Sequence, residues 1–479
     1  MLLRCLFSLL LVSTVLHGQP SVRDVVQDFA GTQELRNAVI AVDVRDVNTG
    51  RQLAGHNAER ACIPASTQKL ITTAAAMDLL GPDHRFRTWL VANGPIEGGT
   101  LRGNLVIVGG GDPTLGSSLM EGVASLDEVV QTWVDKVRAA GITRISGAVV
   151  GDGSYYTTDG AGRGWSWADL GNYYGAGTYG LNVNENAYYL SFSQRQREGA
   201  TPPILDTEPK VPGLVFVNEL TSGPRGSGDR AYIFGAPFNY RQYVRGTIPV
   251  GTGRFRIRGS IPDPALLAAQ LLDRKLEASG VDVVQPPASD QTVGSGPYGN
   301  GKVLDERRSP PLSEIVDRTN LTSNNLYAET LLREMNKARG NTDLASTDIV
   351  IDWLESRGVK TEGVRLLDGS GLSARNFFPP SAMTTLLVDR SGSDRWRESI
   401  PLAGRTGSLR RVLRGTVAEG RVQGKSGTID AVRAYAGYVD RPDGRRLAYS
   451  IAVNNHTLRG SRLNELIYGL MRDLCTASL

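Results

Sequence analysis

Short stretches of alternating apolar and polar residues stand near both ends of the chain and predict strands there. Residues 38–44 alternate and are rich in β-branched side chains, and residues 51–56 form a second such stretch after a turn signal. Toward the other end, the region around residue 425 and residues 433–439 and 447–453 indicate three consecutive antiparallel strands. We expect the two ends of the chain to complete one sheet.

Apolar residues at helical spacing predict helices between these strands. Residues 66–80 are largely apolar on every side, which is typical of a buried helix, and Gly81 follows as its end. Helical patterns recur at residues 126–140, 264–279, 324–337 and 345–357. A last helix, which should pack on the sheet, carries an apolar stripe of Leu463, Leu466, Ile467, Leu470, Met471 and Leu474.

The region from about residue 86 to about residue 260 has a different character, because glycine, tyrosine and short strand patterns dominate it. At 479 residues the chain is also too long for one ordinary core. We therefore predict a discontinuous α/β domain with an antiparallel sheet flanked by helices, interrupted by a long β-rich insertion of two modules. The predicted boundaries are 19–85 and 260–479 for the α/β domain, 86–102 and 159–259 for a β-rich domain, and 103–158 for a small nested α/β domain.

The first eighteen residues have the pattern of a secretory signal. Arg4 precedes an apolar stretch at residues 6–16, and Gly18 offers a small residue for cleavage. The apolar stretch is too short to span a bilayer comfortably, so at most peripheral membrane association is expected. The sequence thus predicts an exported protein, periplasmic where there is a periplasm.

Composition and charge restrict the classes of protein to which this chain can belong. Apolar residues make up 40% of the chain and charged residues 21%, which is typical of a soluble globular protein. The net charge is only +4, and the basic residues are scattered along the chain. A nucleic-acid partner is therefore not expected, because it would need a cluster of basic residues.

Cysteine and histidine give little support to other enzyme classes. After removal of the signal, Cys62 and Cys475 remain, and they either pair or are two buried thiols. No histidine stands near Cys62 to activate it, so a packing role is favoured. The sequence contains no His-Glu-x-x-His pattern and no Gly-x-Ser-x-Gly elbow. We therefore expect no metal and no cofactor.

Ser66 and Lys69 are the first candidate catalytic pair. Residues three apart at the start of a helix face the same side, and the helix N-terminus favours a developing negative charge. A lysine in a dry site near other cations loses its proton readily and can act as a base. The alternative is a capping serine with a surface lysine, but a solvated lysine does not suit so apolar a helix. We therefore favour the catalytic interpretation.

Ser323 and Asn325 form the second element, just before a predicted helix. Alone, they would be interpreted as a helix cap and a turn. Together with the first pair, the Ser323 hydroxyl can relay a proton to a leaving amine, and the Asn325 amide can hold a substrate carbonyl. Glu329 in the same helix is expected to be structural or solvated.

Residues 425–428 form the third element, on a predicted strand. Lys425 adds positive potential, and Gly427 allows close approach of a backbone. Thr428 offers a hydroxyl for a carboxylate, and its N–H can form an oxyanion hole with that of Ser66. Ser426 completes the strand edge, which can pair with an extended peptide. A phosphate-binding loop is the alternative, but the glycine spacing and the following strand disfavour it.

These motifs, in this order, resemble the class C low-molecular-mass penicillin-binding proteins, which form the D-alanyl-D-alanine carboxypeptidase/endopeptidase family. Residues 64–70 are similar to the nucleophile motif of that family, and residues 368–373, followed by Arg375-Asn376, are similar to a second signature. Residues 401–404 and 407–409 add to the resemblance. It covers nearly the whole mature chain, including the long insertion between Ser66 and Ser323, which is far wider than in β-lactamases.

The resemblance implies a penicilloyl-serine transferase-like domain and a defined chemistry. It implies cleavage of D-Ala-D-Ala termini and of D,D-cross-links in peptidoglycan peptides through an acyl-enzyme on Ser66, with β-lactams as covalent inhibitors. By similarity, Asp152 and Arg375 contact the side chain of the third residue of the peptide. The chain departs from the family pattern at Ser426, where threonine is common, and at Asp430, where a neutral polar residue is common.

Three alternatives remain open from the sequence. The balance between carboxypeptidase and endopeptidase activity is not fixed by the motifs. A β-lactamase would need a positioned glutamate for deacylation, and no such signature is evident. A scaffold protein that has lost catalysis is disfavoured because both lysines are kept.

Overall fold

The structure, a computed structural model, describes residues 19–156, 160–294 and 301–479. The predicted signal segment at residues 1–18 lies outside these ranges. Within them, no helix combines the length and the apolar character that crossing a membrane requires.

A five-stranded sheet is built from both ends of the chain, as the sequence predicted. Its order is β19-β20-β21-β1-β2, and every neighbouring pair is antiparallel. The strand bounds are β1 (Val39–Asp46), β2 (Gln52–His56), β19 (Val422–Ile429), β20 (Val432–Asp440) and β21 (Arg446–Asn454). The sheet thereby brings residues 425–428 to an edge strand.

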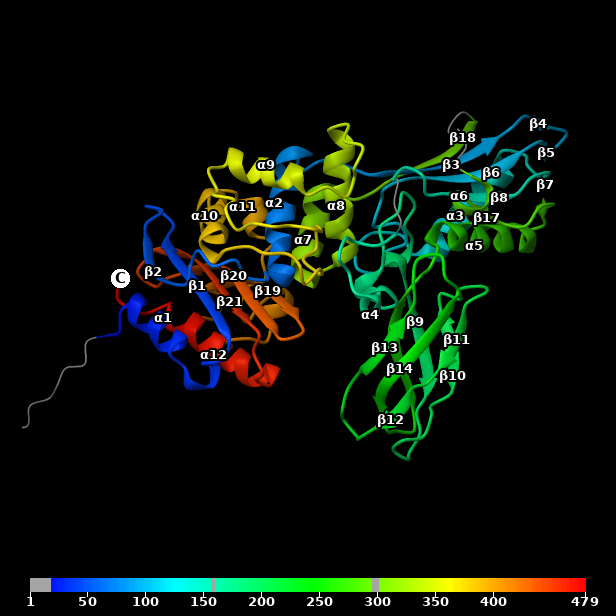
Figure 1. The fold of residues 1–479 in the computed structure, drawn as a ribbon. Helices are drawn as coiled ribbons and strands as arrows, with labels where there is room; N and C mark the ends of the chain where they lie inside the picture. Colours follow the sequence, from blue (N-terminus) through cyan, green and yellow to red (C-terminus); the bar gives the residue numbers. More distant parts are fainter. Residues whose placement is uncertain (1–18, 157–159, 295–300) are drawn as a thin grey trace, which may run out of the picture.

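Helices cover both faces of this sheet (Figure 1). On one face lie α1 (Val22–Ala30) and α12 (Gly460–Asp473), which share a core with Tyr435 and Val439. The alternate positions Ala436 and Tyr438 point into the core of the other face, because side chains alternate along a strand. That core is formed by α2 (Lys69–Leu79), α7 (Leu312–Thr322), α8 (Asn325–Ala338), α9 (Asp348–Ser356), α10 (Pro380–Arg390) and α11 (Asp394–Arg397).

Helix α2 is the central helix of the domain. Every residue from Lys69 to Met77 is buried, in agreement with the prediction of a helix buried on all sides. The α-helix begins at Lys69, since residues 65–68 form a single 3-10 turn, η2 (Ala65–Gln68). Ser66 therefore lies in a tight turn at the entrance of the helix.

The first part of the insertion is an α/β module. Its five-stranded sheet has the order β17-β8-β6-β3-β18, and a smaller sheet has the order β16-β7-β5-β4. Helices α3 (Leu126–Ala139) and α5 (Pro264–Ala278) share its core. The strands are β3 (Arg87–Asn93), β4 (Ile96–Glu97), β5 (Thr100–Leu101), β6 (Asn104–Gly110), β7 (Arg144–Ile145), β8 (Val149–Asp152), β16 (Asp282–Val283), β17 (Ala288–Ser289) and β18 (Lys302–Arg308).

The second part is a β-rich module, which Figure 1 shows as a separate arm. It has a three-stranded sheet, β10-β9-β15, and a four-stranded sheet in which β14 pairs with β11, β12 and β13. The bounds are β9 (Ala187–Ser193), β10 (Ile204–Glu208), β11 (Val215–Asn218), β12 (Thr221–Gly223), β13 (Arg230–Phe234), β14 (Arg241–Pro249) and β15 (Arg254–Ser260). The short α4 (Trp167–Leu170) and η3 (Tyr173–Gly175) lead into it, and α6 (Asp290–Val293) follows β17.

The sheets divide the chain differently from the predicted boundaries. We predicted a return to the main domain at residue 260, but β18 pairs with β3, and β17 pairs with β8, so residues up to 308 stay with the insertion. We also predicted that residues 86–102 join the β-rich module, whereas β3 pairs with β6 in the α/β module. In both cases the boundary depends on pairing between strands that are far apart in the sequence, and no local sequence pattern predicts that pairing.

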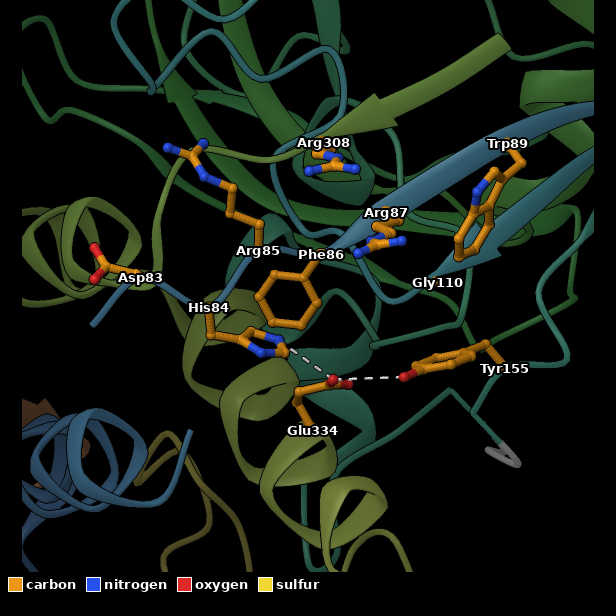
Figure 2. A pocket seen from close by; sticks show the side chains of 10 residues that line it. All are labelled: Asp83, His84, Arg85, Phe86, Arg87, Trp89, Gly110, Tyr155, Arg308 and Glu334. Carbon is orange, nitrogen blue, oxygen red and sulfur yellow. Dashed lines mark hydrogen bonds and ion pairs between the residues drawn. The ribbon is translucent and has the colours of Figure 1, made fainter. Parts of the chain in front are cut away.

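The chain crosses between the main domain and the insertion at a polar junction, shown in Figure 2. Glu334 on α8 accepts hydrogen bonds from the hydroxyls of Tyr156 at 2.8 Å and Tyr155 at 3.4 Å, and it lies 3.3 Å from His84 Nε2. Burial is the largest cause that raises the pKa of Tyr155 to about 12, so this phenol stays a donor. The junction fixes the α/β module against the helix that begins with Asn325.

Candidate active site

Ser66 and Lys69 lie together at the entrance of α2. Lys69 Nζ lies 2.9 Å from Ser66 Oγ, 2.6 Å from Asn325 Oδ1 and 2.7 Å from the carbonyl oxygen of Ser370. An ammonium group has three hydrogens, so these three acceptors satisfy it fully. When the amine is neutral it has a lone pair free, and the Ser66 hydroxyl is the neighbour that can donate to it.

Burial tunes Lys69 for proton transfer. The side chain is 0% exposed, and this desolvation lowers its pKa from 10.5 to about 7, although the charges of Asp368 and Glu329 act in the opposite direction. A base with a pKa near neutrality is present in its free form while still binding a proton well. The site can therefore deprotonate a serine hydroxyl without histidine.

The second hydroxyl and the second lysine form a matching pair. Lys425 Nζ donates to Ser323 Oγ at 2.8 Å and to the carbonyl of Ser426 at 2.9 Å. Burial, followed by the nearby charge of Lys69, lowers the pKa of Lys425 well below its usual value. Each of the two buried lysines thus holds one serine hydroxyl, Lys69 that of Ser66 and Lys425 that of Ser323.

Two of the turns that present these groups have a left-handed backbone. Ala65, directly before Ser66, has φ of 46°, and Ser323 has φ of 60°. Such conformations cost roughly 1–3 kcal/mol for residues other than glycine and are concentrated at functional sites. The backbone strain therefore coincides with the placement of Ser66 and Ser323.

Strand β19 passes directly beside Ser66. A Cβ added to Gly427 would lie 2.6 Å from the carbonyl oxygen of Pro64 and 2.9 Å from the backbone nitrogen of Ser66. Only glycine allows this approach, as the sequence predicted. Thr428 follows on the exposed edge, and Ser426 Oγ contacts Ser408 Oγ at 3.1 Å. Residues 422–429 form a strand with no helix after it, which contradicts a phosphate-binding loop.

A loop at residues 368–376 builds the third acceptor of Lys69, and sequence reasoning assigned it no such role. The Asp368 carboxylate accepts hydrogen bonds from the backbone of Gly371 and Ser373 and from the side chains of Asn376 and Trp165, at 2.7–2.9 Å. This carboxylate shapes the loop so that the Ser370 carbonyl faces Lys69. The only sequence signal was the family-like stretch at 368–373.

Glu329 supports the same loop from α8. It is 4% exposed, and its Oε1 accepts the N–H groups of Gly369 and Ser370 at 3.0 and 2.8 Å. Burial, with the charge of Asp368, raises its pKa to about 7. Of the two expected roles for Glu329, these contacts support the structural one, and its burial excludes a solvated side chain.

A cavity of about 1180 Å³ opens over Ser66. Ser66, Ser323, Asn325 and Thr428 line it, together with residues of the insertion. Asn325 Nδ2 donates to the carbonyl of Tyr174 at 2.7 Å, so one side-chain amide joins the lysine to the wall of the insertion. The cavity thus lies between the main domain and the insertion and can hold an extended peptide.

Neither Asp152 nor Arg375 is among the residues that line this cavity. Asp152 is 5% exposed, its Oδ1 accepts the N–H of Ser154 at 3.0 Å, and it is not among the lining residues. Arg375 is exposed and lies beside Gly164, which does line the cavity. The carboxylates that line the cavity from the insertion are instead those of Asp169 and Glu185, and burial raises the pKa of both. The sequence alone did not distinguish these two aspartates.

Other chemistry finds little support in the described residues. Cys62 and Cys475 are free, buried thiols, and burial raises the pKa of each to about 11, which disfavours a thiolate nucleophile. Across residues 19–156, 160–294 and 301–479, no group of three or more His, Cys, Asp or Glu is arranged to hold a metal ion.

Comparison with known proteins agrees with this geometry. A D-alanyl-D-alanine carboxypeptidase of Actinomadura sp. strain R39 is 31% identical over 444 residues, which cover 88% of this chain and 79% of that protein. The crystal structure of penicillin binding protein 4 from Haemophilus influenzae matches with a TM-score of 0.80 at 24% identity, over 94% of this chain and 99% of the other. The same protein complexed with a novel β-lactam matches with a TM-score of 0.74 at 21% identity, over 95% of this chain and 99% of the other.

A sequence profile extends the likeness along almost the whole described chain. The profile of the D-Ala-D-Ala carboxypeptidase 3 (S13) family matches residues 22–470, which include all three motif elements and both modules of the insertion. This span confirms the resemblance that the motifs indicated, and the structural match confirms the expected fold class. The chain belongs to the D-Ala-D-Ala carboxypeptidase 3 (S13) family.

Proposed function

We propose that this protein is a serine-type D-Ala-D-Ala carboxypeptidase in which Ser66 is the nucleophile and Lys69 its base. The observation that carries the proposal is the 2.9 Å contact between a fully buried lysine, with a pKa of about 7, and a serine hydroxyl in the floor of a peptide-sized cavity. The family to which the chain belongs supports the same reaction.

In the acylation step, neutral Lys69 takes the proton of Ser66 while Oγ attacks the carbonyl carbon of the D-Ala-D-Ala bond. Negative charge then develops on the carbonyl oxygen. The backbone N–H groups of Ser66 and Thr428 are proposed to stabilise that oxygen, and the close approach of β19 to Ser66 supports this pairing. Fixed donors of this kind lose little energy to reorganisation, which favours the transition state over the bound substrate.

Collapse of the tetrahedral intermediate breaks the C–N bond and needs a proton on the leaving nitrogen. Ser323 is proposed to give its proton to that nitrogen and to be reprotonated through Lys425, whose Nζ lies 2.8 Å from Ser323 Oγ. The proton that Lys69 took from Ser66 replaces the one passed on, so Lys69 is neutral when D-alanine leaves. D-Alanine leaves with its amine intact. Water then attacks the ester on Ser66 and gives a proton to Lys69, which is neutral again. Lys69 passes that proton to Ser66 Oγ as the ester C–O bond breaks, and the free enzyme is restored.

The substrates are proposed to be peptidoglycan stem peptides and, through the same steps, D,D-cross-links between them. The size of the cavity and the edge strand β19 suit an extended peptide. β-Lactams are proposed to acylate Ser66, because their strained amide can enter the same steps and the fold is shared with a protein crystallised with a β-lactam. Both substrates would be met outside the cytoplasm, in line with the signal pattern at residues 1–18.

The test is release of D-alanine from an N-acylated peptide that ends in D-Ala-D-Ala, and of monomers from a cross-linked dimer, measured side by side. Ser66→Ala should abolish both, whereas the control Ser356→Ala, on the exposed side of α9, should change neither. Activity of the Ser66→Ala variant, or no release by the wild type, would overturn the proposal. Fast turnover of a penicillin without peptide cleavage would favour a β-lactamase instead.

A further inference from the structure

The β-rich module carries a row of aromatic residues that the proposed steps do not use. Trp167 is 55% exposed and Tyr232 is 48% exposed, whereas Phe234 and Tyr243 are half-buried. The ring centres of Trp167 and Phe234 lie 5.0 Å apart, and those of Tyr232 and Phe234 lie 6.5 Å apart. We call these four residues, together with Arg245, the aromatic strip. Exposed apolar surface that is gathered in one place is typical of a binding site.

The alternation of side chains along β13 and β14 places the strip on the outside of the module. Ile233, which stands between Tyr232 and Phe234, points into the core, so its two neighbours point outward. The register of the two strands places Tyr232 opposite Arg245. It places Phe234 opposite Tyr243. Two neighbouring cross-strand pairs therefore form one continuous outer surface.

The centre of the strip holds a charged pair that is neutral as a whole. The guanidinium carbon of Arg245 lies 5.4 Å from the ring centre of Phe234 and 5.5 Å from that of Tyr243. The same guanidinium forms an ion pair with Glu219. Because this pair leaves no excess charge between the rings, the centre of the strip favours a ligand that is uncharged and has apolar faces.

Polar groups at the rim of the rings remain available for such a ligand. Within the parts of the chain that the structure describes, the indole N–H of Trp167 and the hydroxyls of Tyr232 and Tyr243 have no hydrogen-bond partner. These side chains combine an apolar ring with a polar tip. A pyranose sugar has the matching pattern, because C–H groups form its faces and hydroxyl or acetamido groups its edge.

The strip is continuous with the active-site cavity. Tyr232 lines that cavity, and so do the residues directly before and after Trp167. The side chain of Asn172, just after α4, exchanges hydrogen bonds of 3.1 and 3.3 Å with the backbone of Ile233. These bonds dock α4 on β13, so Trp167 stays beside the strand. The strip thus begins at the wall of the cavity and runs along the arm that Figure 1 shows.

The opposite face of the module is less suited to bind a sugar. There, on the outside of β9, Tyr189 is exposed, but Arg256 lies over its ring at 4.3 Å. Arg256 also pairs with Glu208, and Arg254 pairs with Asp206. Ion pairs therefore cover this face, and Tyr189 offers a matched control for the aromatic strip.

We propose that the aromatic strip binds the chain of N-acetylated sugars to which a stem peptide is attached, so that the enzyme prefers peptides carried by a glycan strand. The inference rests on the proposed function, because it takes the peptide in the cavity as given. With the scissile bond at Ser66, the other end of the stem peptide must leave the cavity. In peptidoglycan that end is joined to a sugar, and the strip offers this sugar a surface that continues the cavity wall.

The experiment compares one stem peptide in two forms. Both end in D-Ala-D-Ala; one is N-acetylated, and the other is amide-linked to a tetrasaccharide of N-acetylglucosamine and N-acetylmuramic acid. The kcat/KM for D-alanine release is measured for wild type, Trp167→Ala/Tyr243→Ala, Trp167→Phe and the control Tyr189→Ala. Calorimetric titration of both forms into Ser66→Ala protein, with and without the two strip substitutions, reports binding without cleavage.

Wild type should prefer the glycan-linked form. The double variant should lower kcat/KM for that form by about 5- to 100-fold, since two aromatic contacts are lost, while changing the free peptide by less than about threefold. Calorimetry should show a similar loss of affinity. Trp167→Phe keeps a ring and should keep most of the preference, and Tyr189→Ala should change neither form by more than about threefold. Activity on the free peptide also reports that each variant is folded.

Equal losses on both forms, or a double variant with the wild-type preference, would overturn the inference. So would a wild type without preference, including one whose strip is covered in a dimer that the double variant dissociates. If the double variant does not fold, Tyr243→Ala decides by the same comparison. A wild type that cleaves neither form would contradict the proposed function, and the calorimetry would still decide whether the strip binds the glycan.

Discussion

Protonation of Lys69 should switch acylation off in acid. The lysine must be neutral to take the proton of Ser66, and burial places its pKa at about 7. Because the protonated form of lysine is the cation, the fraction of Lys69 in the neutral form increases as pH rises and decreases as pH falls. With this pKa, the neutral fraction is about 1% at pH 5, about 9% at pH 6 and about 90% at pH 8. Acylation should thus be about 90-fold slower at pH 5 than at pH 8.

The assay is the second-order rate of acyl-enzyme formation with a penicillin whose carboxylate stays ionised throughout, followed by intact mass from pH 5 to pH 9. The charged groups that face Lys69 are Asp368, Glu329 and Lys425. The pKa of Glu329 is itself raised to about 7. The apparent pKa of the decline in acylation rate at low pH, the acid limb, therefore reflects these interacting residues together and not Lys69 alone. The structure predicts in which direction a substitution near Lys69 should shift the pH at which acylation declines in acid.

Glu329→Gln keeps an oxygen that can accept the N–H groups of Gly369 and Ser370 but removes a negative charge that favours protonated Lys69. The acid limb should therefore move to lower pH. His456 lines the cavity and is the obvious competing source of such a limb, so His456→Gln should leave its position unchanged. A rate that is flat from pH 5 to pH 8, or a limb that vanishes in His456→Gln, would refute the assignment of the base.

Three further substitutions test other contacts. Ser323→Ala removes the partner of Lys425 and should lower kcat/KM for peptide by about 10²- to 10⁴-fold, measured as D-alanine release; a loss below threefold would contradict the relay. Gly427→Ala places a methyl group against Pro64 and Ser66 and should slow penicillin acylation by about 100-fold, since displacement of a reacting group by about 1 Å costs that much. Its control, Gly469→Ala in α12, meets open space and should add about 0.5–1 kcal/mol to the free energy of unfolding without slowing acylation. Tyr156→Phe leaves Glu334 without its 2.8 Å donor and should cost about 1.5–3 kcal/mol in denaturant unfolding, and an unchanged midpoint would show that the junction contributes little.

Local patterns were sufficient for the main sheet and its helices. Residues 38–44 and 447–453 are mostly apolar, as suits strands buried on both faces, and β1 and β21 pair along their whole length. The buried helix α2 was predictable because it is largely apolar on all sides. Lys69, its one basic residue, was also the strongest local sign of chemistry.

Long-range pairing could not be predicted in the same way. The pattern of α5 would look the same whether it packed on the main domain or on the insertion, and β17 and β18 are short strands that pair with partners far back in the chain. The domain boundary at residue 260 therefore had no physical basis in local sequence. That Asp169, and not Asp152, lines the cavity could not be predicted for the same reason, since only the fold decides which carboxylate meets the cavity.

Backbone groups and cross-strand neighbours were also hidden from the sequence. The Ser370 carbonyl completes the contacts of Lys69, but every residue has such a carbonyl, so nothing in the sequence marks this one. Arg433 lies opposite Thr428 because of the register between β19 and β20, and the sequence alone does not show that register. Residues of this kind emerge from the three-dimensional arrangement of ordinary elements.

The most direct measurement of the central claim is peptide mapping of the protein after brief exposure to penicillin. The account predicts one penicilloyl adduct, carried by the peptide that contains Ser66, and its absence in a folded Ser66→Ala variant. An adduct on Ser323 or elsewhere, or a folded wild-type protein that takes up none, would contradict it.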